Sequence, residues 1–271
     1  MNKNIAFIGA GSMAEAIISG VVKAEILNKE QIIVTNKNNR ERVEQLQQKY
    51  DIRSIMDKEK VAHETDIIIL ATKPYDLQKA VESIKPYIRP NHLLISVIAG
   101  VSTDYISNLF GGNTPVVRTM PNTSASIGYS ATAISAGKYA TNEHLEQAET
   151  LFNTIGTTTI VDENDMHTVT GISGSGPAYI YYLVEAMEKA AVEAGLDQEV
   201  ARTLVTQTVV GAGEMLQHSG ESASTLRDKI TSPAGTTAAG IEALDQHHFE
   251  ETIRQCVKSA RDRSIELGEN E

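Results

Sequence analysis

The sequence contains a single cysteine, Cys256, so no disulfide can form within the chain. This excludes a disulfide-stapled scaffold and fits a reducing compartment. Basic residues are also few: 24 Lys and Arg stand against 35 Asp and Glu, and the net charge of −11 argues against a nucleic-acid-binding surface. No apolar run approaches the roughly 18 residues that a membrane span needs. The first apolar run begins at Ile5, which leaves no room for a signal peptide, so we expect a cytoplasmic protein.

Short apolar segments alternate with helical patterns through the first 160 or so of the 271 residues. Continuous apolar strands separated by helices indicate βαβ units and a parallel sheet buried on both faces. Strands are expected at Ile5–Gly9, Ile32–Thr35, Ile67–Ala71, Leu93–Ile98, Val116–Thr119, Ala131–Ser135 and Thr158–Val161.

The remainder of the chain contains only helical patterns. One helix is expected at Tyr179–Ala194, and another begins after Asp197, a good N-terminal cap. The second helix is apolar nearly all round, and such a helix is normally buried. We therefore predict an α/β domain at residues 1–161 and an all-α domain at residues 162–271 that buries its apolar surface against a second copy of the chain.

A glycine-rich turn follows the first expected strand. Gly9, Gly11 and Ala14 fit the pattern G-x-G-x-x-A of dinucleotide-binding Rossmann domains. In that pattern the first glycine permits a tight turn, the second lets a pyrophosphate approach the backbone, and the third small residue lets the helix pack closely. A plain glycine turn is the alternative, but a position after the first strand of a βαβ series favours a dinucleotide site.

The end of the second expected strand distinguishes the two dinucleotides. An NAD site usually has Asp or Glu there to accept hydrogen bonds from the ribose hydroxyls. This chain has Thr35, Asn36, Lys37, Asn38 and Asn39, with no acidic residue among them. The neutral and basic loop predicts NADP, although a solvated turn would also favour these residues.

Two further segments are candidates for ligand contacts. The third strand ends in Ala71-Thr72-Lys73-Pro74, at the sheet edge where α/β proteins bind ligands. The segment from Ser232 to Thr237 precedes a helix, where amides and hydroxyls could hold a carboxylate or merely cap the helix. A glycine-rich stretch, Gly171–Tyr179, opens the long helix, and close helix packing is the favoured interpretation.

No metal-binding spacing, P-loop or nucleophile motif is present. The seven histidines are scattered, and Cys256 lies on an expected helix face. This pattern favours hydride transfer, in which the cofactor carries the reaction and the protein positions and polarises the substrate.

Six segments together resemble the Δ1-pyrroline-5-carboxylate reductase family over nearly the whole length. That family reduces the C=N carbon of Δ1-pyrroline-5-carboxylate to give proline, the last step of proline biosynthesis. The resemblance implies an N-terminal Rossmann domain and a C-terminal helical domain that interlocks in a dimer, from which higher oligomers assemble. The segments are Ile8–Met13, Ala71–Pro74, Ile98–Val101, Met120–Thr123, Thr170–Tyr179 and Ser232–Thr237.

The resemblance also implies site residues and NADPH as the cofactor, with NADH accepted less well. Backbone amides of Ala234 to Thr237 would bind the substrate carboxylate, the Thr237 hydroxyl would sit beside the ring nitrogen as the catalytic group, and Glu163 matches an acidic substrate-site position. The implied substrate-binding residues are Glu163, Ser232, Ala234, Gly235, Thr236 and Thr237, and the implied cofactor-binding residues are Ile8, Gly9, Ala10, Gly11, Ser12, Met13, Asn36, Lys37, Asn38, Asp57, Ala71, Thr72, Lys73, Pro74 and Ala99.

Three positions depart from the family pattern. Ala234 stands where the first of two glycines is common, and its methyl group is expected to narrow the substrate pocket. Ser124 replaces a common proline, and Asp57 replaces an asparagine near the adenosine. None of these changes removes a reacting group.

Two other functions remain as alternatives. A β-hydroxyacid dehydrogenase shares the domain plan, but its catalytic lysine would fall at Ile180, which cannot transfer a proton. A non-catalytic NADP sensor would need the first domain but has no need of the Ser232–Thr237 segment.

Overall fold

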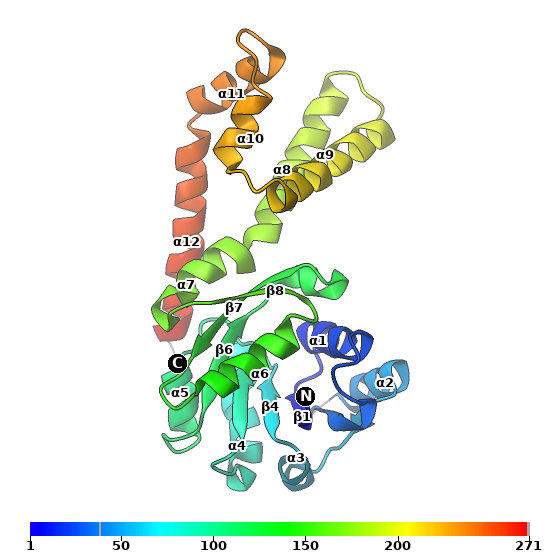
Figure 1. Cartoon of the computed structure of the whole chain (residues 1–271), viewed down its shortest axis with the longest axis vertical. Coiled ribbons are helices and arrows are strands. Elements are labelled where there is room, and N and C mark those ends of the chain that lie inside the picture. Colours follow the sequence, from blue (N-terminus) through cyan, green and yellow to red (C-terminus); the bar gives the residue numbers. More distant parts are fainter. Residues whose placement is uncertain (38, 270–271) are drawn as a thin grey trace. The chain divides into compact units, whose positions relative to one another are not determined.

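An eight-stranded sheet forms the centre of the N-terminal part of the computed structural model, which describes residues 1–37 and 39–269 (Figure 1). All seven expected strands are confirmed to within about two residues at either end, and the very short β3 was not predicted. The strands are β1 Ile5–Ile8, β2 Ile32–Thr35, β3 Arg53–Ser54, β4 Ile67–Leu70, β5 Leu93–Ser96, β6 Val116–Met120, β7 Ser130–Ala136 and β8 Gly156–Ile160.

The strand order is β3-β2-β1-β4-β5-β6-β7-β8, and all neighbours are parallel except β6 and β7. The expected parallel sheet is therefore confirmed, with one antiparallel pair that the sequence did not predict. Consecutive strands can run parallel only if a crossover of roughly a dozen or more residues joins them. Only a short 3₁₀ helix joins β6 to β7, so these two strands run antiparallel. The order reverses between β1 and β4, and in α/β sheets such a switch point is where ligands bind.

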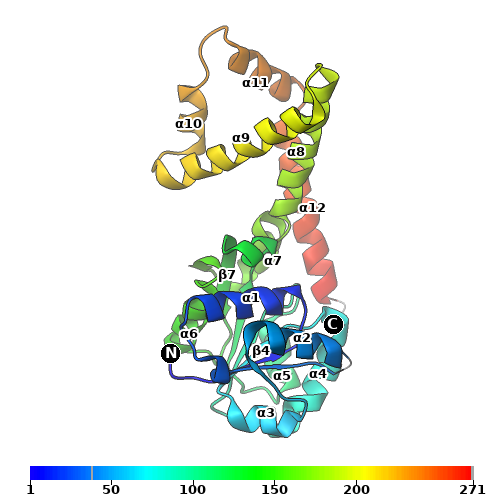
Figure 2. The same cartoon turned by 90° about the vertical axis from the view of Figure 1, so that its right-hand side faces the viewer.

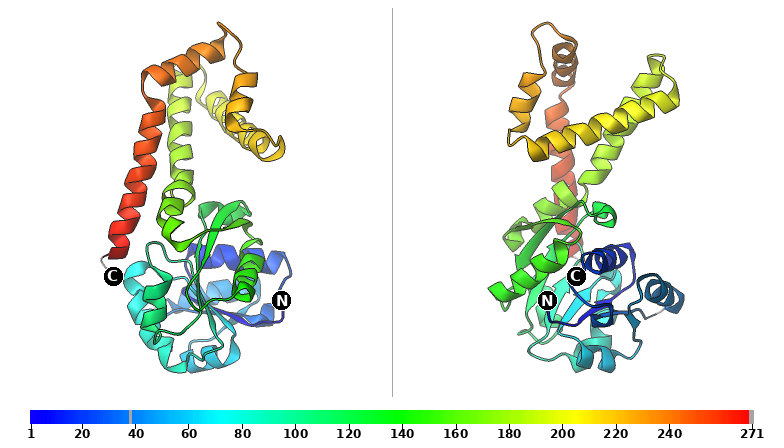
Figure 3. Two further views of the ribbon diagram at one scale, coloured as in Figure 1. Left: turned by 60° about the vertical axis from the view of Figure 1, so that its left-hand side comes forward. Right: turned by 45° about the vertical axis from the view of Figure 1, so that its right-hand side comes forward.

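Helices cover both faces of this sheet (Figure 3). In β1, Ile5 and Phe7 point to one face, and Ala6 and Ile8 point to the other. One face packs against α1 Ser12–Lys23, α2 Arg40–Tyr50 and α6 Asn142–Phe152, and the other packs against α3 Lys58–Glu64, α4 Leu77–Ile84 and α5 Thr103–Leu109.

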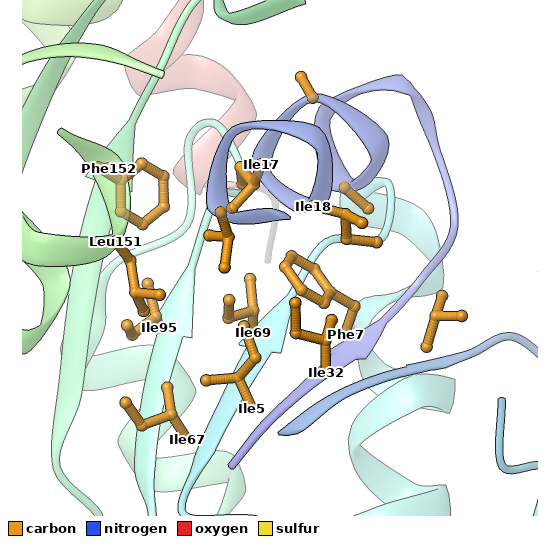
Figure 4. Packing of buried hydrophobic residues seen from close by; sticks show 14 of the residues in the cluster. Ile5, Phe7, Ile17, Ile18, Ile32, Ile67, Ile69, Ile95, Leu151 and Phe152 are labelled. Atoms are coloured by element: carbon orange, nitrogen blue, oxygen red, sulfur yellow. The ribbon is translucent and has the colours of Figure 1, made fainter. Parts of the chain in front are cut away.

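The first of these faces contains the larger hydrophobic cluster, in which Phe7, Ile17 and Phe152 are completely buried (Figure 4). Burying each such side chain contributes about 1.5–3 kcal/mol. The central strands are buried on both faces, as expected. The edge strand β8 is not, since its Ile160 is half exposed. The central strands thus fix the positions of the loops at their carboxyl ends.

Beyond β8 the described part of the chain is helical, as expected. Pro177 lies in the first turn of α8 and Asp197 caps α9 through bonds to the amides of Glu199 and Val200, as their sequence positions predicted. The helices are α7 Met166–Val169, a π-helical turn at Thr170–Gly174, α8 Gly176–Glu193, α9 Gln198–His218, α10 Ala223–Lys229, α11 Thr236–Gln246 and α12 Phe249–Glu269.

The chain divides into two compact units. The first contains the sheet, continues to Ser175 and includes the chain from Ser259 onward; the second consists of Gly176–Lys258. Residues 162–175, which we predicted to belong with the helices, therefore pack with the sheet. The domain boundary that we placed after residue 161, where the helical patterns begin, stays a prediction.

The second unit is built on α8 and α9, which pack against each other (Figure 2). The expectation that α9 is buried is not met within a single chain, because only Ala201 and Val205 of this helix are buried. Its apolar surface includes Leu204 and Leu216, each about half exposed. A surface of this kind on a folded chain marks an interaction site.

Candidate cofactor and substrate sites

A cavity of about 390 Å³ lies at the carboxyl ends of β1, β2 and β4. It occupies the switch point of the sheet, the position predicted for a dinucleotide. The structure brings together nine of the predicted cofactor residues in its lining: Ile8, Gly9, Ala10, Gly11, Asn36, Lys37, Ala71, Thr72 and Lys73.

Gly9 connects the ends of three neighbouring strands. Its amide donates to the carbonyl of Thr35 at 2.9 Å, and the next strand passes so closely that a Cβ on Gly9 would lie 2.3 Å from the Ala71 carbonyl oxygen. Its φ of +119° is also reserved for glycine. A side chain here would force the loop away from β4.

Gly11 caps the N-terminus of α1 and faces open space: a Cβ there would meet no atom within 4 Å. The first amides of a helix have no partners within the helix and favour an anion. An open backbone at this end of the cavity fits a pyrophosphate. Ala14, the third position of the motif, lies on the buried side of α1 and is fully buried.

Arg42 holds the glycine loop from the side. Its Nε donates to the carbonyl oxygen of Ala10 at 3.1 Å, and its Nη2 pairs with the carboxylate of Glu15. Glu15 also accepts hydrogen bonds from Lys49 at 2.9 Å and from Tyr50 at 3.1 Å. Burial raises the pKa of Glu15, but the hydrogen bonds from Lys49, Arg42 and Tyr50 outweigh it and lower the pKa from 4.5 to about 2. This network ties α2 to α1 and to the glycine loop that precedes α1.

Thr72 and Lys73 follow β4 on the opposite side of the cavity. The Thr72 hydroxyl is buried and has no hydrogen-bond partner among the described residues, although buried hydroxyls are nearly always bonded. An orphaned polar atom in the lining fits a polar ligand such as the cofactor. The Lys73 ammonium lies 6.0 Å from the ring centre of Tyr75.

Asn36 and Lys37 follow β2 and also line the cavity. Asn39 caps the N-terminus of α2: its side chain accepts from the Arg42 amide at 2.9 Å, and its own amide donates to the side-chain oxygen of Asn36 at 3.2 Å. The predicted contact Asn38 lies outside the described residues. Four other elements of the prediction, Ser12–Met13, Asp57, Pro74 and Ala99, do not line the cavity.

Asp57 instead caps α3, because its carboxylate accepts from the amides of Glu59 and Lys60 at 2.9 and 3.3 Å. Sequence reasoning missed several lining residues: Lys58, Tyr75, Asp76, Lys79, Ala80 and Ser83. Tyr75 and Asp76 directly follow the Ala71–Pro74 segment, a signal that could have found them. Lys58 belongs to no motif and reaches the cavity only through the fold.

Glu163 lies at the start of a 3₁₀ turn in the first unit, with both carboxylate oxygens engaged. Oε1 accepts from the Thr103 amide at 2.8 Å and lies 3.3 Å from Nη1 of Arg118, while Oε2 accepts from the Thr103 hydroxyl. Burial lowers the pKa of the Arg118 guanidinium, and the nearby Glu163 carboxylate opposes this shift. The structure therefore gives this predicted substrate residue a set of partners within the protein.

The predicted substrate loop lies in the second unit, immediately before α11. The Gly235 amide donates to the carbonyl of Ser232 at 3.0 Å, and a Cβ on Gly235 would lie 2.3 Å from the Ser232 hydroxyl. Gly235 caps α11 without a side chain, so the amides of Thr236 and Thr237 receive no side-chain cap. Ala234 has φ = +58°, the left-handed region that favours glycine.

Two known family models match the chain, one in each half. Residues 163–267 match the model described as pyrroline-5-carboxylate reductase dimerisation, and residues 4–100 match that of NADP oxidoreductase, coenzyme F420-dependent. Among curated proteins, pyrroline-5-carboxylate reductase 1 of Bacillus subtilis is 47% identical over 99% of this chain and 90% of its own length. The chain belongs to the pyrroline-5-carboxylate reductase family. A second B. subtilis family member, pyrroline-5-carboxylate reductase 2, is also 47% identical, over 98% of this chain and 96% of that protein.

Solved structures of the family agree with this fold. The pyrroline-5-carboxylate reductase from Coxiella burnetii superposes with a TM-score of 0.92 at 32% identity, covering 98% of this chain and 99% of that one. The Plasmodium falciparum enzyme, solved with NADP bound, gives 0.86 at 31% identity and 98% coverage of both chains. A Rossmann domain followed by a helical dimerisation domain, predicted from the sequence, is therefore confirmed, as are the nicotinamide cofactor and self-association.

The described residues also bear on other classes of site. None of their helices is long and apolar enough to cross a membrane. Nor do three or more His, Cys, Asp and Glu side chains gather there in a way that could hold a metal ion. Ile180, where a β-hydroxyacid dehydrogenase would carry its lysine, is an ordinary residue of α8.

Proposed function

We propose that this chain reduces Δ1-pyrroline-5-carboxylate to proline with NADPH, the last step of proline biosynthesis. The observation that carries the proposal is the cavity at the switch between β1 and β4, with open backbone at Gly11, in a member of this family. When bound, NADPH supplies the hydride that the C=N carbon receives. The residues of the chain bind and orient the two reactants.

NADPH is the preferred cofactor in this proposal, and NADH is accepted less well. The loop after β2 presents Asn36 and Lys37 to the cavity and contains no carboxylate that would repel a 2′-phosphate. Gly11 and the first amides of α1 hold the pyrophosphate, and Thr72 and Lys73 contact the cofactor from the β4 side.

The substrate carboxylate is held by the loop before α11. Amides at this helix start favour an anion because they have no partners within the helix. We assign the contacts to Ser232 and to the amides of Ala234–Thr237, with the Thr237 hydroxyl at the ring nitrogen. The sequence also assigned Glu163 to the substrate, and we keep that assignment as part of the proposal; within the first unit its carboxylate bonds the Thr103 amide and faces Arg118.

The alternatives are weaker on specific grounds. Ile180 cannot provide the proton transfer of a β-hydroxyacid dehydrogenase. A non-catalytic NADP sensor does not need the substrate loop. We place the protein in the cytoplasm, where the reducing environment suits its single cysteine.

The test is NADPH oxidation by the purified protein with pyrroline-5-carboxylate, beside a panel of β-hydroxyacids assayed with NADP. We expect turnover with the imino acid alone, and a higher kcat/KM with NADPH than with NADH. Asn36→Asp should erode that preference, because its carboxylate would repel the 2′-phosphate. Activity with a β-hydroxyacid in place of the imino acid would overturn the proposal.

A further inference from the structure

Lys58 is a cation in the cofactor cavity to which neither sequence motifs nor the proposed reaction gave a role. It is the first residue of α3 and is partly buried. Its side chain lines the cavity together with Asn36 and Lys37. Its ammonium donates a hydrogen bond to the hydroxyl of Thr35, the last residue of β2, which is itself fully buried.

The charge of Lys58 has no ion-pair partner among the described residues, whereas the more exposed lysines Lys60 and Lys29 do. Lys60 lies 3.9 Å from the Glu64 carboxylate, and Lys29 lies 3.3 Å from Asp51. The adjacent carboxylate of Asp57 is occupied as the cap of α3. Burial lowers the pKa of the Lys58 ammonium, and only the Coulombic effect of Asp57 opposes it. A partly buried charge without a counter-ion is costly unless an anion completes it.

The position of Lys58 identifies the anion. In this fold the carboxyl end of β2 is where the adenosine ribose of a dinucleotide lies, and a basic residue nearby accommodates a 2′-phosphate. An ammonium has three donors, so the bond to Thr35 leaves two for phosphate oxygens and holds the side chain in place.

We propose that Lys58 binds the ribose 2′-phosphate of NADPH and is a main determinant of the selectivity for NADPH over NADH. The assignment rests on the proposed NADPH use and names the side chain that produces it. Thr35 acts as a positioning residue, because its hydroxyl holds the ammonium at the strand end.

A structural role for Lys58 makes a different prediction. If the lysine served only to order Thr35 and the start of α3, its loss would weaken both dinucleotides equally. If it contacted the pyrophosphate, the same would hold, because both dinucleotides carry that group. Only a contact with the 2′-phosphate, which NADPH has and NADH lacks, would make the loss of Lys58 weaken NADPH binding more than NADH binding.

The experiment measures equilibrium dissociation constants of NADPH and NADH for wild-type protein and for Lys58→Met, which keeps the length of the side chain and removes the charge. The matched control is Lys60→Met, two residues away on the same helix and facing Glu64. We expect Lys58→Met to weaken NADPH binding by about 10- to 150-fold, the range for a hydrogen bond to a charged group. NADH binding should change by less than about twofold, as should both dinucleotides with Lys60→Met.

Adenosine 2′,5′-bisphosphate and adenosine 5′-monophosphate serve as probes that lack the nicotinamide half. Lys58→Met should lower the affinity for the bisphosphate alone, and Lys58→Arg should restore most of it. Equal losses for both probes, or a preference for the bisphosphate that survives in Lys58→Met, would overturn the assignment. A wild-type protein that binds the two probes equally would instead overturn the NADPH preference, and the assignment with it.

Discussion

The carboxylate of Glu163 accepts a hydrogen bond of 2.8 Å from the backbone amide of Thr103, 60 residues earlier in the chain. Thr103 is the first residue of α5, so Glu163 supplies an acceptor to a helix N-terminus as a distant cap. The same carboxylate faces Arg118, whose side chain is only 2% exposed. Glu163 thereby joins α5, β6 and the start of the segment that leads to α7.

We predict that Glu163→Gln lowers the free energy of unfolding, and that this loss of stability is its main effect. The change removes the charge that faces Arg118 and leaves the guanidinium buried without a counter-ion. Hydrogen bonds to charged groups contribute about 1.5–3 kcal/mol, so the free energy of unfolding should fall by roughly that amount. Chemical denaturation measures the loss, with the exposed Glu146→Gln as a control. An unchanged denaturation midpoint together with a raised KM for the imino acid would instead establish direct substrate binding.

A second prediction concerns acid stability at the α1–α2 junction. The pKa of Glu15 is lowered from 4.5 to about 2, so its stabilising effect is fully present above pH 4.5 and is lost as the pH falls towards 2. Glu15→Gln should therefore cost on the order of 1–3 kcal/mol at neutral pH, a range that allows for solvent screening at the exposed Lys49.

The unfolding curves of wild-type protein and Glu15→Gln should converge as the pH is lowered from 4.5 towards 2. Glu146→Gln, an exposed change inside α6, is the control and should leave the unfolding curve close to that of the wild type. A stability difference that stayed constant from pH 7 to pH 2 would contradict the role of the Glu15 charge.

The same change, alanine to glycine, should have opposite effects on stability at Ala234 and at Ala239. An alanine at φ = +58° pays a steric cost of about 1–2 kcal/mol that glycine avoids, partly offset by the greater freedom of glycine in the unfolded chain. We expect Ala234→Gly to raise stability by about 0.5–1 kcal/mol. Ala239→Gly, inside α11, should lower it by about the same amount. Thermal melting of both variants tests this, and a decrease for both would show that Ala234 is not strained.

The sequence predicted those features that depend on local pattern. Continuous apolar runs such as Ile67–Leu70 marked the central strands, and the glycine motif marked the cavity at their ends. The antiparallel β7 was missed, since strand direction depends on the length of a connection rather than on the composition of the strand.

Contacts between distant residues could not be read from the sequence. Glu163 meets Arg118 and Thr103 across 45 and 60 residues, and no spacing rule links them. Lys58 reaches the cavity because α3 begins beside the end of β2. The left-handed backbone of Ala234 was not predicted either, because an alanine gives no sign in the sequence of a positive φ.

The exposed apolar side chains of α9 lead to a prediction about self-association. Leu204 is 55% exposed in the single chain, so Leu204→Glu should leave the fold of the chain intact. Burying the new charge in an apolar interface would cost several kcal/mol, by rough estimate, and should weaken the dimer by at least about tenfold. Light scattering across a dilution series measures the assembly, with Leu204→Met as the control. An unchanged mass at every concentration would place Leu204 outside the interface.

The last prediction concerns Thr237, in the first turn of α11. We expect its hydroxyl to hydrogen-bond the ring nitrogen of a substrate whose carboxylate is held by the preceding amides, so Thr237→Val removes that bond and keeps the shape. A hydrogen bond to a charged partner contributes about 1.5–3 kcal/mol, so kcat/KM for the imino acid should fall roughly 10- to 150-fold.

NADPH affinity separates this role from a role in cofactor binding. It should barely change in Thr237→Val, because the residues that line the cofactor cavity all belong to the first unit. Thr237→Ser, which restores the hydroxyl, should recover most of the lost kcat/KM. Near wild-type kcat/KM in Thr237→Val would refute the role, and a large loss of NADPH affinity would assign the loop to the cofactor. A fall in kcat/KM that Thr237→Ser fails to reverse would show that the methyl group, which Thr237→Val keeps, is needed in addition to the hydroxyl.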